Sequence, residues 1–308
     1  MVSSSVLDLI GNTPLLKLRI APPGSATVLA KLEAANPGGS VKDRVALAIV
    51  EDAEARGKLK AGGVVVEVSA GNTGVALAMV AAAKGYRAIL VIPENAPPEQ
   101  RRLLSWLGAE VVLTPSSEGM AGAVGAAKQM VKRNRNYFMA RQFENPANPQ
   151  AHSTTTAQEV LKATGGQVDA FVCGVGTGGT LTGVGRVLKE QRPGVPGVKI
   201  VAVEPARSPL LSQGRAGPHG IPGLGPDFVP PLLDRGLIDQ VIAVSDDDAH
   251  DTASRLAQEE GLLVGLSSGA NVFASLKVAA GMEEGQQVVT ILPDGPGPSF
   301  LSMLLREP

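Results

Sequence analysis

The pattern that most constrains this chain is the alternation of short apolar runs with longer segments of helical periodicity. Runs rich in Val, Ile and Ala recur along it: VVVEVSA, AILVIPE, EVVLTP, DAFVCGVG, KIVAVEP, QVIAVS and VVTILPD. Between most of them, apolar residues recur at helical spacing. Strands covered on both faces are continuously apolar, and parallel strands need helical crossovers. The pattern therefore predicts an α/β fold whose mostly parallel, twisted sheets are flanked by helices.

The chain is long enough for two domains of this kind, and one segment interrupts the alternation of strands and helices. A length of 308 residues suits about two domains. The stretch RQFENPANPQAHSTTT is polar and proline-rich, as inter-domain segments often are. We therefore expect an N-terminal domain over 1–145 and a C-terminal domain over 146–308, with the first ~35 residues able to pack on the other domain. Residues 205–240, rich in Pro and Gly, are expected to form a long loop region.

Composition excludes several classes of function. Hydrophobic residues make up 44% of the chain, charged residues 19%, and the formal net charge is −1. Such a chain can bury a full core but has no overall field for nucleic acid or an acidic membrane surface. One cysteine excludes an internal disulfide framework, and three scattered histidines give no metal-ligand spacing, so no metal is expected. The longest apolar run, 75–83, is too short to cross a bilayer, and no signal peptide is evident, so a cytoplasmic location is expected.

The stretch NPGGSVKDR, residues 36–44, places a lysine at the mouth of a predicted helix. Proline and two glycines break regular structure, and Ser40 with Asp43 predicts a capping box. Lys42 then lies in the first helical turn, where the positive end of the macrodipole disfavours a cation. Such an amine suits a nucleophile or Schiff-base former, although the position alone favours a solvated lysine.

The stretch GTGGT, Gly176 to Thr180, predicts an anion-binding loop between a strand and a helix. Successive backbone N–H groups at a helix N-terminus form a cradle that phosphate can approach closely. The same segment satisfies G-x-G-x-x-G, and Glu204 ends the next strand. The dinucleotide fingerprint places an acid about 20 residues after the glycines, so an NAD-binding domain is a rival interpretation.

Two further turns join a strand to a helix. SAGNTG, Ser69 to Gly74, offers backbone donors, hydroxyls and the Asn72 amide, which suit a small carboxylate. LSSGA, 266–270, is predicted to be a third turn, whose serines alone would be read as caps. A lysine, a phosphate cradle and a carboxylate turn together fit a site for pyridoxal phosphate and an amino acid. An NAD enzyme leaves NPGGSVKDR unexplained.

Taken together, the motifs resemble the O-acetylserine sulfhydrylases (cysteine synthases) of the fold-type II pyridoxal-phosphate family. The shared motifs are IGNTPL, KLEAANPGGSVKDR, SAGNTG, QFENPANP with His152, GVGTGGTLTG, VAVEPARSP and GLLVGLSSGA. The resemblance implies two α/β domains of the tryptophan synthase β-like kind, with pyridoxal 5′-phosphate as cofactor. GTGGT and GPHGIPGLGPDF look more like the A-type enzymes than the B-type.

The resemblance also implies a role for individual residues. Lys42 would be the Schiff-base lysine, and Asn72 would bond the phenolic oxygen of the cofactor. Ser267 would face the pyridine nitrogen. The remaining implied roles are phosphate binding, by Gly176, Thr177, Gly178, Gly179 and Thr180, and binding of the substrate carboxylate, by Ser69, Gly71, Asn72, Thr73 and Gln142.

Two features depart from the family pattern. The chain has Ser69-Ala70 where the family usually has threonine-serine, so one carboxylate-binding hydroxyl is missing and weaker substrate binding is expected. It also ends GPGPSFLSMLLREP, with Pro298 and Ser299 before Phe300 in place of the usual basic residue and aromatic-Leu-Ser motif. This departure bears on the C-terminal edge of the site and on dimer formation.

The resemblance implies that O-acetylserine and sulfide give cysteine and acetate, in a homodimer with serine acetyltransferase as a possible partner. Three alternatives remain open from the sequence. They are another enzyme of the same fold (cystathionine β-synthase or a serine/threonine dehydratase), a non-catalytic relative that binds the cofactor, and an NAD-binding oxidoreductase. The intact Lys42 argues against the non-catalytic relative.

Overall fold

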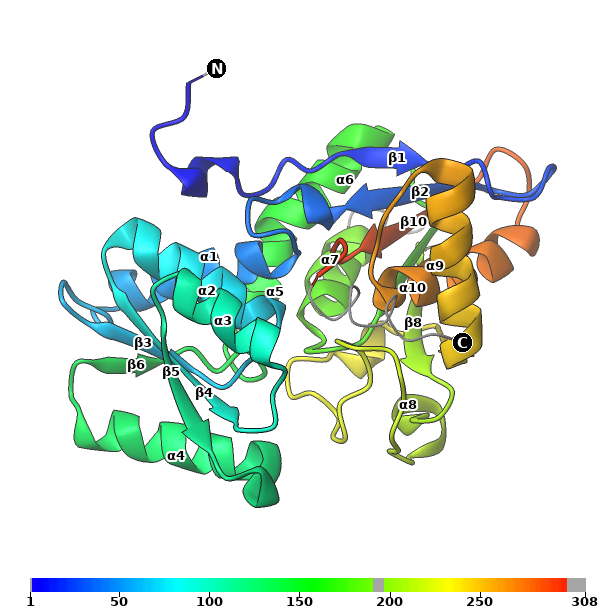
Figure 1. The fold of residues 1–308 in the computed structure, drawn as a ribbon. Coiled ribbons are helices and arrows are strands. Elements are labelled where there is room, and N and C mark those ends of the chain that lie inside the picture. Colours follow the sequence, from blue (N-terminus) through cyan, green and yellow to red (C-terminus); the bar gives the residue numbers. More distant parts are fainter. Residues whose placement is uncertain (1, 191–196, 298–308) are drawn as a thin grey trace. The chain divides into compact units, whose positions relative to one another are not determined.

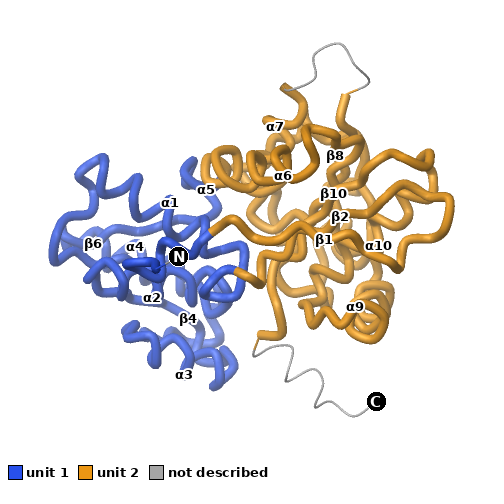
Figure 2. Tube along the Cα trace, turned by 90° about the horizontal axis from the view of Figure 1, so that it is seen from above, with its two compact units in different colours: residues 1–10, 36–148 blue, residues 11–35, 149–308 orange. Residues whose placement is uncertain are grey.

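The computed structural model describes residues 2–190 and 197–297. The chain divides into two compact units, one of residues 1–10 and 36–148 and one of residues 11–35 and 149–308 (Figure 2). Each unit has its own sheet (Figure 1). The early segment 11–35 belongs to the second unit, where it contributes two strands. The C-terminal motif from Pro298 onward, on which one expectation rests, lies outside the described residues.

The first unit has a four-stranded, all-parallel sheet in the order β5-β4-β3-β6. Its strands are β3 (Val64–Glu67), β4 (Arg87–Pro93), β5 (Glu110–Thr114) and β6 (Tyr137–Met139). Its helices are α1 (Lys42–Ala55), α2 (Asn72–Lys84), α3 (Pro98–Trp106) and α4 (Gly119–Arg133), and α5 (Ala147–Ala151) follows at the crossing to the second unit. Single 3₁₀ turns lie at Val6–Leu9 and Ser116–Glu118.

Helices cover both faces of this sheet, as the apolar runs require. Val65 packs with residues of α1 and α2 on one face. Its neighbours Val64 and Val66 point the opposite way and pack with Ala123 and Ala127 of α4. Figure 1 shows α1, α2 and α3 on one side of the sheet and α4 on the other. A strand buried on both faces needs no polar alternation, which explains the unbroken VVV of β3.

The second unit has a six-stranded sheet in the order β1-β2-β10-β7-β8-β9. Its strands are β1 (Leu15–Lys17), β2 (Thr27–Leu32), β7 (Ala170–Gly174), β8 (Lys199–Pro205), β9 (Gln240–Val244) and β10 (Gln287–Leu292). Only β1 runs antiparallel, against β2. Its helical elements are 3₁₀ turns at Glu33–Ala35 and Arg235–Leu237, a π-helical turn at His152–Thr156, α6 (Ala157–Thr164), α7 (Gly179–Glu190), α8 (Leu210–Gln213), α9 (Asp246–Glu260) and α10 (Leu266–Ala280).

Two separate apolar layers cover this second sheet. Val172 and Val201 face the layer that includes residues of α9 and α10. Phe171 and Ile200, their neighbours in sequence, face the layer that includes residues of α6 and α7. The predicted fold class, mostly parallel sheets flanked by helices, is confirmed. No helix among residues 2–190 and 197–297 is long and apolar enough to cross a membrane.

Some local expectations were wrong. LSSGA is not a turn, because Leu266 begins α10 and Gly265 is its N-cap in extended conformation. A Cβ at Gly269 would lie 2.0 Å from the carbonyl oxygen of Ala249, so this glycine lets α10 lie against α9. Strand β6 was not expected, because its three half-buried residues give too short a pattern to detect.

Candidate functional site

Lys42 is the first residue of α1, and the chain before it is held by side-chain caps. The Ser40 hydroxyl accepts the N–H of Lys42 at 3.2 Å, and the Asp43 carboxylate accepts the N–H of Gly38. A Cβ at Gly38 would lie 2.5 Å from Asp43 Oδ1, which explains why glycine stands there. The helix starts one residue later than the predicted N-cap at Ser40 implies, with Val41 as N-cap. The prediction that Lys42 lies in the first turn is confirmed, and the side chain is half-buried.

The turn from Ser69 to Thr73 follows β3 and opens α2. Gly71 is the extended N-cap, and both Gly71 and Asn72 are exposed, whereas Thr73 is buried. The Ser69 hydroxyl accepts the N–H of Gly74 at 3.3 Å, and a Cβ at Gly74 would lie 2.5 Å from the Ser69 carbonyl oxygen. The turn therefore presents a helix N-terminus, which favours an anion.

Gln142 lies in the segment that follows the neighbouring strand, β6. Strands β3 and β6 pair in parallel, so the segments that follow them lie at the same edge of the sheet. The Thr73 hydroxyl donates to Gln142 Oε1 at 2.6 Å, and both residues are buried. The structure thus brings together two residues that the resemblance assigned to carboxylate binding, although 69 positions separate them.

In the second unit, the loop GTGGT joins β7, which ends at Gly174, to α7, which begins at Gly179. Gly178 has φ +80°, and the Thr177 hydroxyl accepts the N–H of Gly179 at 3.3 Å. A Cβ at Gly176 would lie 2.3 Å from the carbonyl oxygen of Gly223. Glycine is therefore required here by close backbone approach, and the loop keeps the form of a cradle at a helix N-terminus.

His152 supports this loop from the π-helical turn. The Thr180 hydroxyl lies 3.2 Å from His152 Nε2, and His152 Nδ1 lies 2.9 Å from the Thr156 hydroxyl. The imidazole is buried. The sequence included His152 in a shared motif but gave it no role. The sequence offered one indication of a role: His152 lies in a polar segment and has no partner at metal-ligand spacing, so a metal did not account for it.

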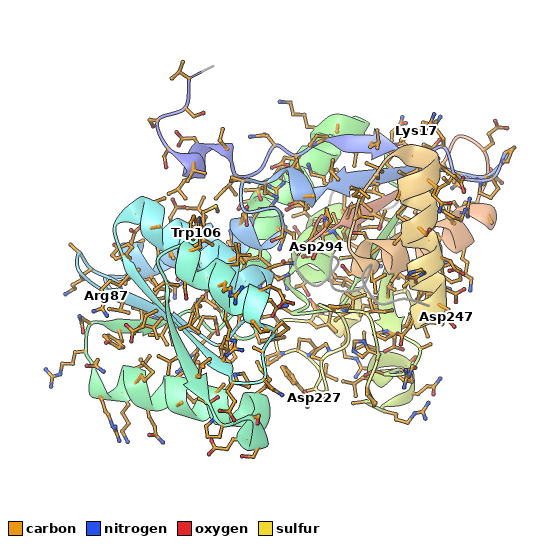
Figure 3. The ribbon with its side chains drawn as sticks, viewed as in Figure 1. Lys17, Arg87, Trp106, Asp227, Asp247 and Asp294 are labelled. Atoms are coloured by element: carbon orange, nitrogen blue, oxygen red, sulfur yellow. The ribbon has the colours of Figure 1, made fainter. Side chains whose placement is uncertain are left out.

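Ser267 lies in the first turn of α10 and is buried, with only 5% of its surface exposed. The N-cap Gly265 donates its N–H to the carbonyl oxygen of Asp294, which follows β10 and is labelled in Figure 3. A Cβ at Gly265 would lie 2.2 Å from Asp294 Oδ1. The start of α10 is thus packed closely against the segment that follows β10, and Ser267 is buried beside this contact.

The residues in each unit fit pyridoxal phosphate. The cradle in the second unit offers backbone N–H groups and hydroxyls, and its glycines Gly176 and Gly178 have no room for a Cβ. Such a loop suits a phosphate monoester. The first unit offers a half-buried primary amine at a helix start, which suits an aldehyde. Within the described residues, no group of three or more His, Cys, Asp or Glu side chains could hold a metal ion.

Glu204 does not behave as the acid of a dinucleotide site. It is buried, and its carboxylate accepts the N–H groups of Leu211 and Ser212 at the start of α8. An acid that reads ribose hydroxyls needs accessible oxygens. The NAD interpretation therefore lacks the acidic residue that should follow the glycine motif.

A shallow hollow of about 610 Å³ lies on α3, lined by Pro98, Arg101, Arg102, Ser105 and Trp106. None of the predicted site residues lines it. Trp106 is 88% exposed (Figure 3).

The sequence matches the family described as "Pyridoxal-phosphate dependent enzyme" over residues 6–294. The chain belongs to the pyridoxal-phosphate dependent enzymes. Membership of this family settles the cofactor class and makes the NAD interpretation wrong. The recognised resemblance to fold-type II enzymes is confirmed.

Relatives within the family match nearly the whole chain. The cysteine synthase of Staphylococcus aureus is 49% identical over 300 residues, which are 97% of this chain and 95% of the relative. The solved structure of cysteine synthase from Entamoeba histolytica is 39% identical with a TM-score of 0.93, covering 99% of this chain and 91% of that one. The O-acetylserine dependent cystathionine beta-synthase of Helicobacter pylori is 39% identical with a TM-score of 0.90, covering 98% of each chain.

Proposed function

We propose that this pyridoxal-phosphate enzyme replaces the acetate of O-acetyl-L-serine by sulfide and so forms L-cysteine. The observation that carries the proposal is the 49% identity to a cysteine synthase over 97% of the chain. The geometry agrees with it, since Lys42 begins α1 and two anion-binding turns begin α2 and α7.

Lys42 would hold the aldehyde of the cofactor and later act as general base. When bound, pyridoxal phosphate supplies an electron-withdrawing ring that stabilises negative charge at the substrate Cα. With the substrate bound, the Lys42 amine would remove the Cα proton and finally return it. The Cβ–O bond breaks with its electron pair leaving on acetate, and a Cβ–S bond forms to sulfide.

The other residues would bind and orient. The substrate carboxylate suits Ser69, Gly71, Asn72, Thr73 and Gln142, because a helix N-terminus and side-chain donors gather there. Gly176 to Thr180 would hold the phosphate group, with His152 fixing the Thr180 hydroxyl. Asn72 would bond the phenolic oxygen, and Ser267 the pyridine nitrogen.

A neutral hydroxyl at Ser267 favours β-replacement over other reactions of the same cofactor. A serine, unlike an aspartate, does not hold a proton on the pyridine nitrogen, so negative charge at Cα is less stabilised. Loss of a good leaving group at Cβ can follow proton removal directly. Transamination and racemisation require the charge to persist, so they are suppressed.

A second candidate differs only in the sulfur nucleophile. The Helicobacter pylori relative is described as an O-acetylserine dependent cystathionine beta-synthase and covers 98% of this chain. The same residues would then activate O-acetylserine, with homocysteine in place of sulfide.

We also keep four finer proposals that follow from the resemblance. The chain forms a homodimer, works in the cytoplasm and can bind serine acetyltransferase. The unit that contains Lys42 serves as the substrate domain, and the unit that contains GTGGT serves as the phosphate-binding domain.

The test is a spectroscopic titration of the purified yellow protein. O-Acetylserine alone should shift the visible absorbance of the cofactor, and sulfide should restore it with release of cysteine. Restoration by homocysteine but not by sulfide would favour the second candidate. An unchanged spectrum with O-acetylserine would contradict both.

A further inference from the structure

The carboxylate of Glu67 is buried at the end of β3, next to the candidate carboxylate-binding turn. Only 4% of the residue is exposed. In the sequence, Glu67 follows Val66, which is in the core, and stands two residues before Ser69. An acid inside the apolar run VVVEV is costly to bury unless its oxygens are hydrogen-bonded.

Both oxygens of Glu67 accept backbone N–H groups. Oε1 accepts from Val68 at 2.8 Å, and Oε2 accepts from Gln142 at 3.1 Å. Among the described residues, no lysine or arginine forms an ion pair with Glu67. The carboxylate thus joins the segment after β3 to the segment after β6, across 75 positions of sequence.

The segment after β6 contains a strained residue, and the hydrogen bond to Glu67 helps to hold it in place. Arg141 has φ +54°, a left-handed conformation that costs a non-glycine residue energy. That conformation turns the chain so that the Gln142 N–H meets Glu67 and its side-chain oxygen accepts the Thr73 hydroxyl. With Oε1 engaged by Thr73, the Nε2 end of Gln142 is the donating end.

We propose that Glu67 is a positioning residue for the substrate carboxylate, acting through Gln142. It fixes the backbone of Gln142 against the turn at Ser69 to Thr73, so that amide and helix N–H donors converge on one anion. The inference rests on the proposed function, because it assumes that an amino acid binds at this turn.

Burial raises the pKa of the Glu67 carboxyl, while the N–H groups of Val68, Gln142 and Arg141 oppose the rise and nearby Glu144 adds to it. The N–H groups of Val68 and Gln142, one on each oxygen, are matched by a carboxylate and not by an amide, which places its own N–H₂ against one of them. A carboxylate is therefore the side chain that this position requires.

The test is Glu67→Gln, assayed for synthase activity and cofactor content. We expect the KM for O-acetylserine to rise about tenfold, because one buried N–H loses its acceptor and Gln142 shifts. The kcat, the KM for sulfide and the cofactor content should stay within about twofold, because Glu67 touches neither cofactor nor reacting atoms. In a Gln142→Ala background the same change should have little further effect, since both act on one group.

The matched control is Glu204→Gln, a buried glutamate that also accepts backbone N–H groups but lies in the other unit. It should leave the KM for O-acetylserine unchanged. A folded Glu67→Gln protein with the wild-type KM overturns the inference. So does a full tenfold effect that persists in Gln142→Ala.

If Glu67→Gln does not fold, Glu67→Asp is the variant to assay. It keeps the charge and both acceptor oxygens, but its shorter side chain moves them away from the N–H group of Gln142. A raised KM supports the inference, and an unchanged KM overturns it. If the wild-type protein itself fails to convert O-acetylserine, the proposed function fails and the inference falls with it. An active wild type with an unaffected Glu67→Gln variant rejects the inference alone.

Discussion

Lys42, the proposed Schiff-base lysine, stands at a helix N-terminus, the positive end of the helix macrodipole. It begins α1, where helix N–H groups are unpaired within the helix, and its side chain is half-buried. The capping bonds at Ser40 and Asp43 hold the chain before it. The backbone at this lysine is therefore fixed, as a covalent cofactor site requires.

Lys42→Ala should abolish turnover, with a loss of at least roughly 10²–10⁴-fold, because no other group is assigned as general base. Borohydride reduction followed by peptide mapping should place a pyridoxyl label on Lys42 in the wild type and on no lysine in the variant. A label on a different lysine would contradict the assignment.

Ser267 and Ser268 are adjacent and buried, so substitution distinguishes their roles. Ser267→Asp should lose synthase turnover and accumulate the amine form of the cofactor, because an aspartate holds a proton on the pyridine nitrogen. The measurement is the visible and near-ultraviolet spectrum after incubation with amino acids.

Ser268→Asp is the matched control. The Ser268 hydroxyl is buried without a hydrogen-bond partner among the described residues, so a charge there should destabilise the fold without altering the cofactor chemistry. If Ser268→Asp instead produces the amine form and Ser267→Asp does not, the assignment is displaced by one residue.

Among the structural elements, α1, α2 and the turn before β4 meet at a small polar cluster. Glu54 accepts hydrogen bonds from Lys84 and from Tyr86, each at 2.9 Å. Burial opposes ionisation of Glu54, but the two donors outweigh it and lower its pKa below 4.5. The pKa of Lys84 is raised, chiefly by Glu54 and against burial.

Glu54→Gln should lower the free energy of unfolding by about 0.5–1 kcal/mol at pH 7, since the pair is partly exposed and screened. A lowered carboxyl pKa stabilises the fold above its unfolded value near 4.5, and this contribution disappears as the pH falls through the folded pKa. Urea unfolding at pH 7 and pH 3 measures the free energy of unfolding of both proteins, and the difference between them should be smaller at pH 3. Glu51→Gln, whose 3.6 Å contact with Lys84 is more exposed, should have a smaller effect.

The loop between β7 and α7 depends on glycine for space as well as conformation. Gly176→Ala should weaken cofactor binding at least about tenfold, because the new Cβ would lie 2.3 Å from the Gly223 carbonyl oxygen and displace the cradle. Equilibrium dialysis of the reconstituted protein measures the affinity. Gly125→Ala in α4, where a Cβ meets nothing within 4 Å, is the control and should bind normally. Equal affinities would show that the loop does not hold the phosphate.

At the scale of the whole molecule, the chain forms two compact units that each have their own core, and residues proposed to hold the cofactor occur in both. A ligand that binds only the folded chain stabilises it by mass action, by about 2.7 kcal/mol at a hundredfold excess over Kd. Cofactor content should therefore control thermal stability.

Removal of pyridoxal phosphate with hydroxylamine should lower Tm by about 5–10 °C, given a shift of roughly 2–4 °C per kcal/mol for a domain of this size. Differential scanning calorimetry measures the shift, and added cofactor should reverse it. Identical melting of the two forms would mean that the cofactor contributes no stability to either unit.

The sequence by itself determined the fold class and the local geometry of the motifs other than LSSGA, which begins α10. Apolar periodicity and glycine-rich turns depend on residues that are close in sequence. The elements β3, α2, β7 and α7 could therefore be predicted from the sequence. The position of Lys42 in a first helical turn was determined in the same way.

Only the tertiary structure decided which distant segments meet. The pairing of β3 with the undetected β6 brings Gln142 to Thr73 and Glu67, across 69 and 75 positions. The tertiary structure also places His152 beside Thr180. The physical reason is that strand order and helix packing minimise the free energy of the whole sheet, and this long-range balance leaves no local signal in the sequence.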